Sequence, residues 1–510
     1  MKTIGQILSA APPDAIAIRA PGQNALTHGA LSRFVAETGG VLRQAGITRA
    51  DRAAIVLPNG AAMATAFLAV ANACTAAPLN PAYTQDEFKF YLQDLNAKLL
   101  ITDSADGPAA QAANALGIRV AAIRTEPGAP AGIFSLPLDP GPAVPLQEAR
   151  PADEALVLHT SGTTSRPKIV PLSQANVSAS AANVAASLAL TPADTCMNIM
   201  PLFHIHGLIA AVLSSLHAGG SIYCTPGFNA LKVFAWLQDA APSWYTAVPT
   251  MHQAILSRAA RNQEAVSTAK LRFIRSSSSS LPPQVMAELQ ETFGCPVVEA
   301  YGMTEAAHQM TSNPVEPGKQ KPGSVGLAAG PDVRIWDGTI LTEEADILGE
   351  IVIRGANVTA GYEANEKANA ENFFADPDGN GTWFRTGDQG RFDAEGYLSI
   401  TGRLKEIINR GGEKISPREV DEILIDHPAV AQAVTFAVPH KQLGEEPAAA
   451  VVLRDGATAQ PQDIRAFAAE RLAGFKVPRQ VLILDEIPKG ATGKLQRIGL
   501  HEKLRLGAEA

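Results

Sequence analysis

The middle of the chain alternates short β-type runs with Ala- and Leu-rich helical stretches, and this alternation restricts the fold more than any other feature. The runs typical of strands lie at residues 53–57, 99–102, 156–159, 222–224 and 271–275. The stretches typical of helices lie at residues 86–95, 174–188, 208–216, 231–239 and 283–293. Such alternation indicates parallel βαβ units, in which ligands bind at the carboxyl ends of the strands. The sequence therefore predicts an α/β fold.

The pattern changes in the last third of the chain. From residue 323 to residue 400, strand-like runs are separated by Gly- and Asp-rich turns, which predicts a smaller β-rich subdomain. Beyond it we expect helices at 416–426 and 461–472 and strands at 431–438 and 448–453. A chain of 510 residues is too long for one core. We expect a large N-terminal domain, residues 1–403, of α/β subdomains plus the β-rich subdomain, and a small α+β C-terminal domain, residues 404–510.

Charge and cysteine content exclude several classes of protein. The net charge is −8, whereas a protein that coats nucleic acid should be basic, so we expect no nucleic-acid partner. The apolar run at 61–77 is Ala-rich and carries polar residues, which favours a buried helix over a membrane span. The four cysteines show no CxxC spacing and favour buried free thiols in a reducing compartment. We therefore expect a cytoplasmic protein with neither a signal peptide nor a membrane partner.

The strongest local signal is a hydroxyl-rich loop after the expected strand at 156–159. Residues 158–168 read Leu-His-Thr-Ser-Gly-Thr-Thr-Ser-Arg-Pro-Lys. Hydroxyl groups, backbone N–H groups and a lysine are the donors that a polyphosphate needs. The glycine spacing is not that of a Walker A loop, and a polar surface loop is the alternative. The candidate ligands of phosphate are Thr160, Ser161, Gly162, Thr163, Thr164 and Lys168.

Two later motifs carry carboxylates. Residues 301–305 read Tyr-Gly-Met-Thr-Glu, in which Thr304 could contact a phosphate oxygen and Glu305 could hold Mg²⁺, an ion that prefers oxygen ligands. The alternative is an ordinary helix start. Residues 383–388 read Trp-Phe-Arg-Thr-Gly-Asp, and Asp388 in a tight turn could bind both hydroxyls of a ribose. The alternative is a turn aspartate that caps its own backbone.

Two more segments lie in the C-terminal part. Residues 401–415 contain Arg403, Lys405 and the adjacent Gly411 and Gly412, which permit backbone angles that other residues resist and leave room for a thin ligand. The alternative is a flexible linker. Residues 488–495 present Lys494 on a loop of small residues, from which it could reach another domain's site. The alternative is a solvated lysine near the chain end.

The five motifs follow one another in an order that resembles the adenylate-forming superfamily, which contains acyl-CoA synthetases, luciferases and the adenylation domains of peptide synthetases. The resemblance implies an AMP-forming acid–thiol ligase that joins a carboxylic acid to CoA through an acyl-adenylate, with Mg²⁺ as cofactor and ATP and CoA as cosubstrates. It also implies that the small domain is mobile and serves both half-reactions. The sequence departs from the family at Ser165 and Ile169, where glycine is frequent, and Arg166 adds a charge.

The resemblance assigns roles to the matching residues. Lys494 would bridge the carboxylate and the α-phosphate, Thr304 would contact the α-phosphate, and Glu305 would hold Mg²⁺. The hydroxyl-rich loop would hold the β- and γ-phosphates. The remaining assignments are Glu299, Ala300 and Tyr301 to ATP or AMP, Asp388 and Arg403 to the ribose, Lys405 to the hinge, and Gly411, Gly412 and Glu413 to the route of CoA.

Within the superfamily the chain is most similar to the oxalate–CoA ligase subgroup, through residues 159–168, 201–207, 244–250, 271–276, 308–314 and 409–417. The segments that form the acyl pocket in this family carry the polar candidates His204, Arg275, Ser280 and His308. An apolar acyl tail would leave such groups unpaired at roughly 1–3 kcal/mol each, whereas a second carboxylate would pair with them, above all with arginine. Arg275 in a structural ion pair is the alternative, and His159, His206 and His252 are expected to be structural.

We therefore expect oxalate as the acid. Malonate or another short- or medium-chain carboxylate is the first alternative. An adenylation enzyme that loads a carrier protein is the second, and a non-catalytic nucleotide-binding protein is the third. We expect a monomer or a small homo-oligomer.

Overall fold

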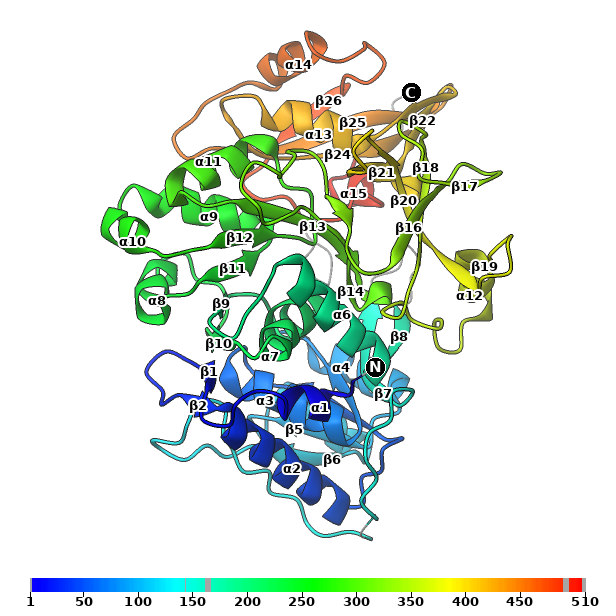
Figure 1. Ribbon diagram of the computed structural model, residues 1–510. Coiled ribbons are helices and arrows are strands. Elements are labelled where there is room, and N and C mark those ends of the chain that lie inside the picture. Colours follow the sequence, from blue (N-terminus) through cyan, green and yellow to red (C-terminus); the bar gives the residue numbers. More distant parts are fainter. Residues whose placement is uncertain (1, 143, 161–166, 489–494, 507–510) are drawn as a thin grey trace. The chain divides into compact units, whose positions relative to one another are not determined.

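The computed structural model describes residues 2–142, 144–160, 167–488 and 495–506 (Figure 1). The chain divides into two compact units. The larger unit comprises Met1–Thr160, Pro167–Asp332 and Ile353–Thr382, and the described part of the smaller unit lies within Val333–Val352 and Trp383–Ala510. The mixed α/β fold with a large N-terminal and a small C-terminal part confirms the fold class predicted from the sequence.

The first sheet of the larger unit has six strands in the order β6-β5-β3-β4-β7-β8. Its strands are β3 (Arg52–Val56), β4 (Thr75–Pro78), β5 (Leu99–Thr102), β6 (Arg119–Ala122), β7 (Glu154–Thr160) and β8 (Lys168–Ser173). All neighbours are parallel except β7 and β8, which are antiparallel. The helices of this part are α1 (Ile4–Leu8), α2 (His28–Gln44), α3 (Ala61–Ala73), α4 (Gln85–Asp94) and α5 (Pro108–Ala115).

The second sheet of the larger unit has nine strands in the order β15-β14-β13-β12-β11-β9-β10-β1-β2. Its parallel centre consists of β1 (Ile16–Arg19), β9 (Thr195–Asn198), β10 (Ser221–Cys224), β11 (Trp244–Ala247), β12 (Phe273–Ser276) and β13 (Val297–Met303). Its antiparallel edges are β2 (Leu26–Thr27), β14 (His308–Ser312) and β15 (Leu327–Ala328). The helices around it are α6 (Gln174–Ser187), α7 (Ser214–His217), α8 (Val233–Ala240), α9 (Pro249–Ala259), α10 (Gln263–Thr268) and α11 (Pro283–Phe293).

A third sheet has the order β17-β16-β18-β20-β19, with β21 paired to β20. Its elements are β16 (Asp332–Trp336), β17 (Leu341–Thr342), β18 (Gly349–Arg354), β19 (Phe373–Ala375), β20 (Thr382–Phe392) and β21 (Leu398–Arg403), with α12 (Glu366–Asn372) before β19. This is the β-rich region that the sequence predicts between residues 323 and 400.

The fourth sheet, in the smaller unit, has the order β23-β22-β25-β24, with β26 paired to β25. Its elements are β22 (Ile408–Arg410), β23 (Glu413–Ile415), β24 (Val430–His440), β25 (Gly444–Leu453) and β26 (Gln480–Ile483), with α13 (Pro417–Ile425), α14 (Pro461–Ala469) and α15 (Leu500–Lys503). Buried residues of α13, α14, β24 and β25 share one apolar core, which includes Val420, Leu424, Val451 and Ile464. Ser416 holds the N-cap position of α13, but its hydroxyl donates to the Thr401 carbonyl and does not cap the helix.

The helix expected at 208–216 is mostly a π-helix and not an α-helix. Residues His206–Leu213 form a π-helix, and α7 follows it. Every residue of the π-helix is buried, so its apolar sequence does not distinguish i→i+4 from i→i+5 hydrogen bonding. π-Helical turns are frequent at functional sites. This one begins at His206, which the sequence alone assigned to packing.

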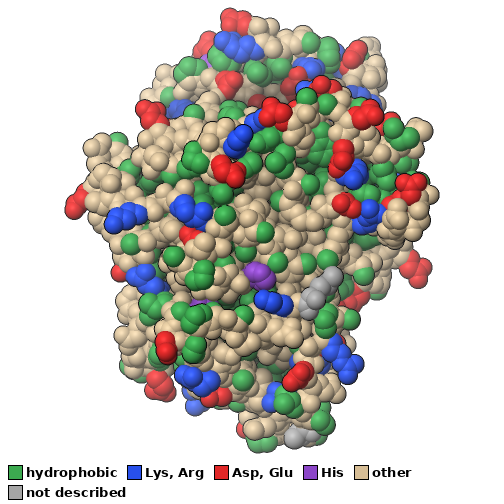
Figure 2. Space-filling view, viewed as in Figure 1, with side chains coloured by type: hydrophobic (Ala, Val, Ile, Leu, Met, Phe, Trp, Pro, Cys, Tyr) green, Lys and Arg blue, Asp and Glu red, His purple; other side chains and the backbone are tan. Residues whose placement is uncertain are grey.

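The apolar run at 61–77 is the buried helix α3 followed by strand β4, as the sequence predicts. No helix among the described residues is long and apolar enough to cross a membrane. All four cysteines are free and buried. Lys and Arg side chains are interspersed with Asp and Glu on the face that Figure 2 shows.

Candidate active site

The two ends of the hydroxyl-rich loop lie next to each other. Thr160 ends β7, Lys168 begins β8, and the two residues are paired in the antiparallel ladder. The Lys168 ammonium lies 4.3 Å from the ring centroid of Tyr362, a residue that no sequence motif indicated. Ser161, Gly162, Thr163, Thr164 and Lys494 lie outside the described residues. Lys168, the lysine of the predicted phosphate site, is thus the first residue of β8.

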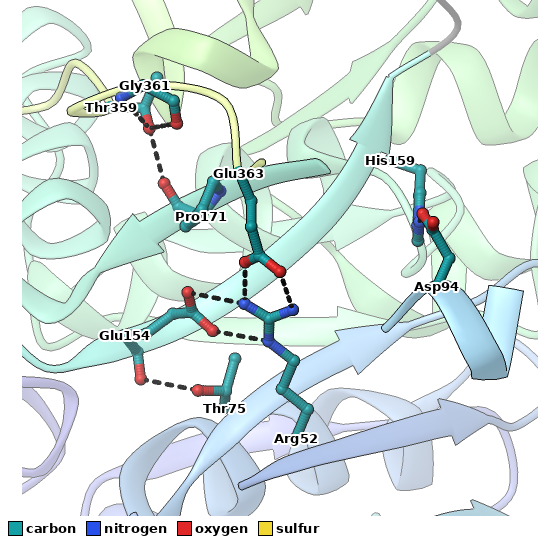
Figure 3. Close-up of polar contacts among 9 residues, drawn as sticks. All are labelled: Arg52, Thr75, Asp94, Glu154, His159, Pro171, Thr359, Gly361 and Glu363. Carbon is teal, nitrogen blue, oxygen red and sulfur yellow. Dashed lines mark hydrogen bonds and ion pairs between the residues drawn. The ribbon is translucent and has the colours of Figure 1, made fainter. Parts of the chain in front are cut away.

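His159 is held by a nearby carboxylate. Its Nε2 lies 3.0 Å from Asp94 Oδ2, and both side chains are largely buried (Figure 3). Burial lowers the pKa of His159, and the hydrogen bond to Asp94 opposes that shift. This pair joins the end of α4 to β7 and supports the structural role expected for His159.

The carboxylate predicted to hold magnesium follows β13 directly. Thr304 and Glu305 lie in a single 3₁₀ turn, Thr304–Ala306. Glu305 Oε1 accepts a hydrogen bond of 2.9 Å from the Tyr362 hydroxyl. Among the residues that the structure describes, no cation pairs with the half-buried Glu305 carboxylate. An anionic oxygen site with only a neutral donor on it fits a hard divalent cation such as Mg²⁺.

Close approach of two strands explains the glycine of the Tyr-Gly-Met-Thr-Glu motif. A Cβ atom on Gly302 would lie only 1.6 Å from the carbonyl oxygen of His308 on β14. The chain then turns through Ala307 and His308, whose φ angles of 47° and 110° are in the left-handed region. Such conformations in residues other than glycine are costly and are concentrated at functional sites. This strained turn sets the position of His308.

Glu299, Ala300 and Tyr301 lie on β13 before that turn. Glu299 is buried, and its Oε1 accepts a hydrogen bond of 2.9 Å from the Leu281 amide. The Ala300 carbonyl accepts one of 2.8 Å from the Ser277 hydroxyl. Both bonds hold the serine run against β13, so Glu299 and Ala300 shape the loop that carries Ser280, which is half-buried.

Arg275, near the carboxyl end of β12, is completely buried. Nη1 lies 3.3 Å from His206 Nε2, Nη2 donates to Gln309 Oε1 at 3.2 Å, and Nε has no hydrogen-bond partner among the described residues. No described carboxylate pairs with this guanidinium, so the structure does not support the alternative of a structural ion pair. Burial lowers its pKa to about 9. A buried cation without a counter-ion is costly unless an anion arrives.

The histidines around Arg275 form a polar cluster. The ring of His206 lies 5.0 Å from that of His308, centroid to centroid. Because Arg275 can only donate, His206 Nε2 accepts, and the Nδ1 proton then points to Ser278 Oγ, 3.0 Å away. Ser278 is exposed and has a φ of 71°, also in the left-handed region. His204 is half-buried and lies two residues before the π-helix.

The candidates for the ribose and the hinge lie in the smaller unit. Asp388 and Arg403 are opposite each other on β20 and β21, and Arg403 Nε donates to Asp388 Oδ1 at 2.8 Å. The expected tight turn at Asp388 is wrong, because the residue lies within β20 and is paired with Arg403 of β21. The strand bends just before it, where Gly387 has a φ of 75° and the Asp388 amide donates to the Thr386 hydroxyl at 3.1 Å.

Lys405 lies in a 3₁₀ turn, Leu404–Glu406, directly after β21. Gly411 and Gly412 join β22 to β23, and Glu413 begins β23. The φ angles of Gly411 and Gly412 are 60° and 99°, in the region that glycine adopts without steric cost. The adjacent glycines are thus required by a hairpin turn, and the linker alternative is wrong.

Two family matches span most of the chain. Residues 8–363 match the AMP-binding enzyme family, and residues 419–494 match the AMP-binding enzyme C-terminal domain. The chain belongs to the AMP-binding enzyme family.

Curated relatives narrow the class. An oxalate–CoA ligase of Arabidopsis thaliana is 46% identical over 494 residues, which cover 95% of each chain. An oxalate–CoA ligase of Saccharomyces cerevisiae is 41% identical over 88% of this chain and 86% of its own length. Together with the family matches, these relatives confirm the predicted AMP-forming acid–CoA ligase.

Solved structures agree with this class. The ATP-bound MatB of Rhodopseudomonas palustris superposes with a TM-score of 0.86 at 28% identity and covers 99% of both chains. The o-succinylbenzoate CoA synthetase of Bacillus subtilis in complex with ATP and magnesium has a TM-score of 0.82 at 28% identity, covering 98% of this chain and 99% of its own.

Proposed function

We propose that the protein activates oxalate. Oxalate and ATP would give oxalyl-adenylate and pyrophosphate, and the thiol of CoA would then displace AMP to give oxalyl-CoA. The observation that carries the choice of acid is the buried Arg275 guanidinium without a carboxylate partner among the described residues. The two oxalate–CoA ligases that resemble the chain over most of its length support the same choice.

A dianion suits the polar cluster around Arg275 better than an apolar acid does. Arg275 is covered by its neighbours, so its charge would act on the substrate through His206 and through the low dielectric of the interior. His206 donates from Nδ1 to Ser278, which leaves the Ser278 hydroxyl proton available for an anion. The second carboxylate of oxalate would lie against this end of the cluster, where Ser280, His204 and His308 would complete its binding.

The ATP side follows from the remaining residues. Lys168 and the loop before it would bind the β- and γ-phosphates, Thr304 the α-phosphate, and Asp388 with Arg403 the ribose. Glu305 would hold Mg²⁺, which supplies charge neutralisation and a template for the phosphates when it is bound. Negative charge develops on the phosphate oxygens during adenylation, so Lys494 would act there by electrostatic stabilisation.

The second half-reaction needs a different arrangement of the small domain. We propose that residues 404–510 move about a hinge at Lys405, and that the Gly411–Gly412 turn and Glu413 then line the route of CoA. A turn of two glycines has no side chain to obstruct a thin pantetheine arm. We also propose a reducing, cytoplasmic location, because the four cysteines are free and buried, and a monomer or small homo-oligomer.

The experiment is a thioester assay with a panel of acids. Purified protein, Mg-ATP and CoA are incubated with oxalate, malonate, acetate or octanoate, and the acyl-CoA is measured by mass spectrometry. Oxalyl-CoA as the main product supports the proposal. Malonyl-CoA as the only product would support recognition of a second carboxylate but reject oxalate as the substrate. Octanoyl-CoA as the only product would reject the role of Arg275. No thioester from any acid would favour the carrier-protein or non-catalytic alternatives.

A further inference from the structure

A short segment, Thr359 to Glu363, connects the phosphate side of the candidate site to its metal side. Tyr362 is its fourth residue and is buried. The ring of Tyr362 lies under the Lys168 ammonium, 4.3 Å from the centroid, and its hydroxyl donates to Glu305 Oε1 at 2.9 Å. One side chain thus contacts both the lysine at the exit of the phosphate loop and the carboxylate predicted to hold Mg²⁺.

The backbone of the same segment is bonded to both neighbours. The Thr359 amide donates to the Glu305 carbonyl at 2.7 Å. The Thr359 hydroxyl donates to the Pro171 carbonyl on β8 at 2.7 Å, as Figure 3 shows. The Glu363 amide donates to the Ile169 carbonyl, one residue beyond Lys168, at 3.1 Å. The segment is therefore tied to the turn of Glu305 at one end and to the strand of Lys168 at the other.

A half-buried arginine anchors the far end of the segment. Arg52, on β3, forms a two-pronged ion pair with Glu363 and another with Glu154 on β7, as Figure 3 shows. The Thr75 hydroxyl in turn donates to the Glu154 carbonyl at 3.3 Å. These contacts lie among the strands of the first sheet, so Tyr362 is held by a rigid scaffold.

We propose that Tyr362 is a positioning residue that fixes Lys168 and Glu305 relative to each other, and hence the polyphosphate relative to its metal ion. The inference rests on the phosphate and metal roles given above to Lys168 and Glu305. Phenol is well suited to this task because it is neutral: it orients the carboxylate by one oxygen without cancelling the charge that a divalent cation needs. The aromatic face meanwhile attracts the ammonium without donating to it.

Metal binding tests the proposal without relying on turnover. Mn²⁺ binding is measured by electron paramagnetic resonance on the full chain with a non-hydrolysable ATP analogue. Outer-shell partners of metal ligands typically affect affinity 10- to 100-fold, so we expect Tyr362→Phe to weaken Mn²⁺ binding by roughly 10-fold. Because the ring remains, binding of the analogue without metal should change little. Tyr362→Leu removes the ring too and should weaken both.

Tyr223→Phe is the matched control, since the Tyr223 hydroxyl also donates to a carboxylate, that of Asp239. It should leave Mn²⁺ binding unchanged, and thermal melting of all variants identifies any that fail to fold. A Tyr362→Phe protein that melts like the parent and binds Mn²⁺ equally well would overturn the inference while the proposed function stands. A parent protein that binds no Mn²⁺ with the analogue would instead count against the proposed function.

Discussion

Replacing Arg275 by methionine should change which acid the enzyme prefers. The parent guanidinium is fully buried, donates at 3.2 Å to Gln309 and has no described carboxylate beside it. In the proposed function the charge acts on the substrate through His206 and not by direct contact. Two unit charges about 4 Å apart interact by about 4 kcal/mol at an effective dielectric constant of about 20, and an intervening imidazole roughly doubles the distance, which leaves about 2 kcal/mol. At about 1.4 kcal/mol for each factor of ten, kcat/KM for oxalate should fall roughly 30-fold.

The same structure predicts little loss of stability. Removing a buried cation that has no counter-ion relieves a desolvation penalty, whereas His206 keeps its contact of 2.6 Å with the Thr246 hydroxyl. Gln309 Oε1 loses its donor, at about 1–3 kcal/mol, which partly offsets the gain. We therefore expect a melting temperature close to that of the parent protein.

The assay compares kcat/KM for oxalate and for acetate, which lacks the second carboxylate. Acetate should be unaffected or improved by Arg275→Met. Arg272→Met is the matched control, because Arg272 precedes the same strand but pairs with Asp194 at 3.1 Å. That variant should leave the ratio of oxalate to acetate unchanged. An equal fall for both acids in Arg275→Met would show that Arg275 only supports the fold, and an unchanged value for oxalate would reject its role in recognition.

Three further outcomes follow from other parts of the chain. Burial lowers the pKa of His252 from 6.5 to about 3, so between these two pH values the unfolded chain binds a proton that the folded chain does not. The free energy of unfolding should therefore fall on acidification below about pH 6.5, by at most about 1.4 kcal/mol per pH unit. Urea unfolding of His252→Asn as a function of pH should show a smaller decline. In the smaller unit, Arg497 Nη1 lies 2.7 Å from Asp421 Oδ2. Arg497→Met leaves this buried carboxylate without its cation and should destabilise the unit by about 3–5 kcal/mol. Amide hydrogen exchange in α13 should then be faster than in the parent protein, and unchanged exchange would contradict this prediction. Lys494→Ala should slow adenylation severely but leave CoA attack on supplied acyl-adenylate largely intact, and equal loss of both steps would reject the assignment.

Local sequence signals predicted the elements whose formation depends on neighbours along the chain. The helix at 283–293 begins with a proline and ends before a glycine, and α11 has the same bounds, with Gly294 at a φ of 64°. The strand before the hydroxyl-rich loop also has a local signal, an apolar run that is followed directly by polar residues. The sequence could not show why glycine is needed at position 302, because the reason is the close approach of the His308 carbonyl oxygen from the neighbouring strand.

Contacts between distant segments account for what the sequence did not predict. His206 is the first residue of a π-helix and contacts Arg275 on β12, and an apolar run carries no signal for that contact. Asp388 was placed in a turn because Thr-Gly-Asp is typical of turns, whereas pairing with β21 keeps it in a strand. Tyr362 gave no signal, since its contacts are with Lys168 and Glu305, far away in the sequence.

Exchange of labelled pyrophosphate into ATP tests the central claim most directly. The reaction contains protein, Mg-ATP, labelled pyrophosphate and oxalate, but no CoA, so label enters ATP only if an oxalyl-adenylate forms reversibly. We expect exchange that depends on oxalate and is lost in Lys494→Ala. Exchange that proceeds with acetate or octanoate but not with oxalate would contradict the assignment of the acid, and no exchange with any acid would contradict the adenylate mechanism itself.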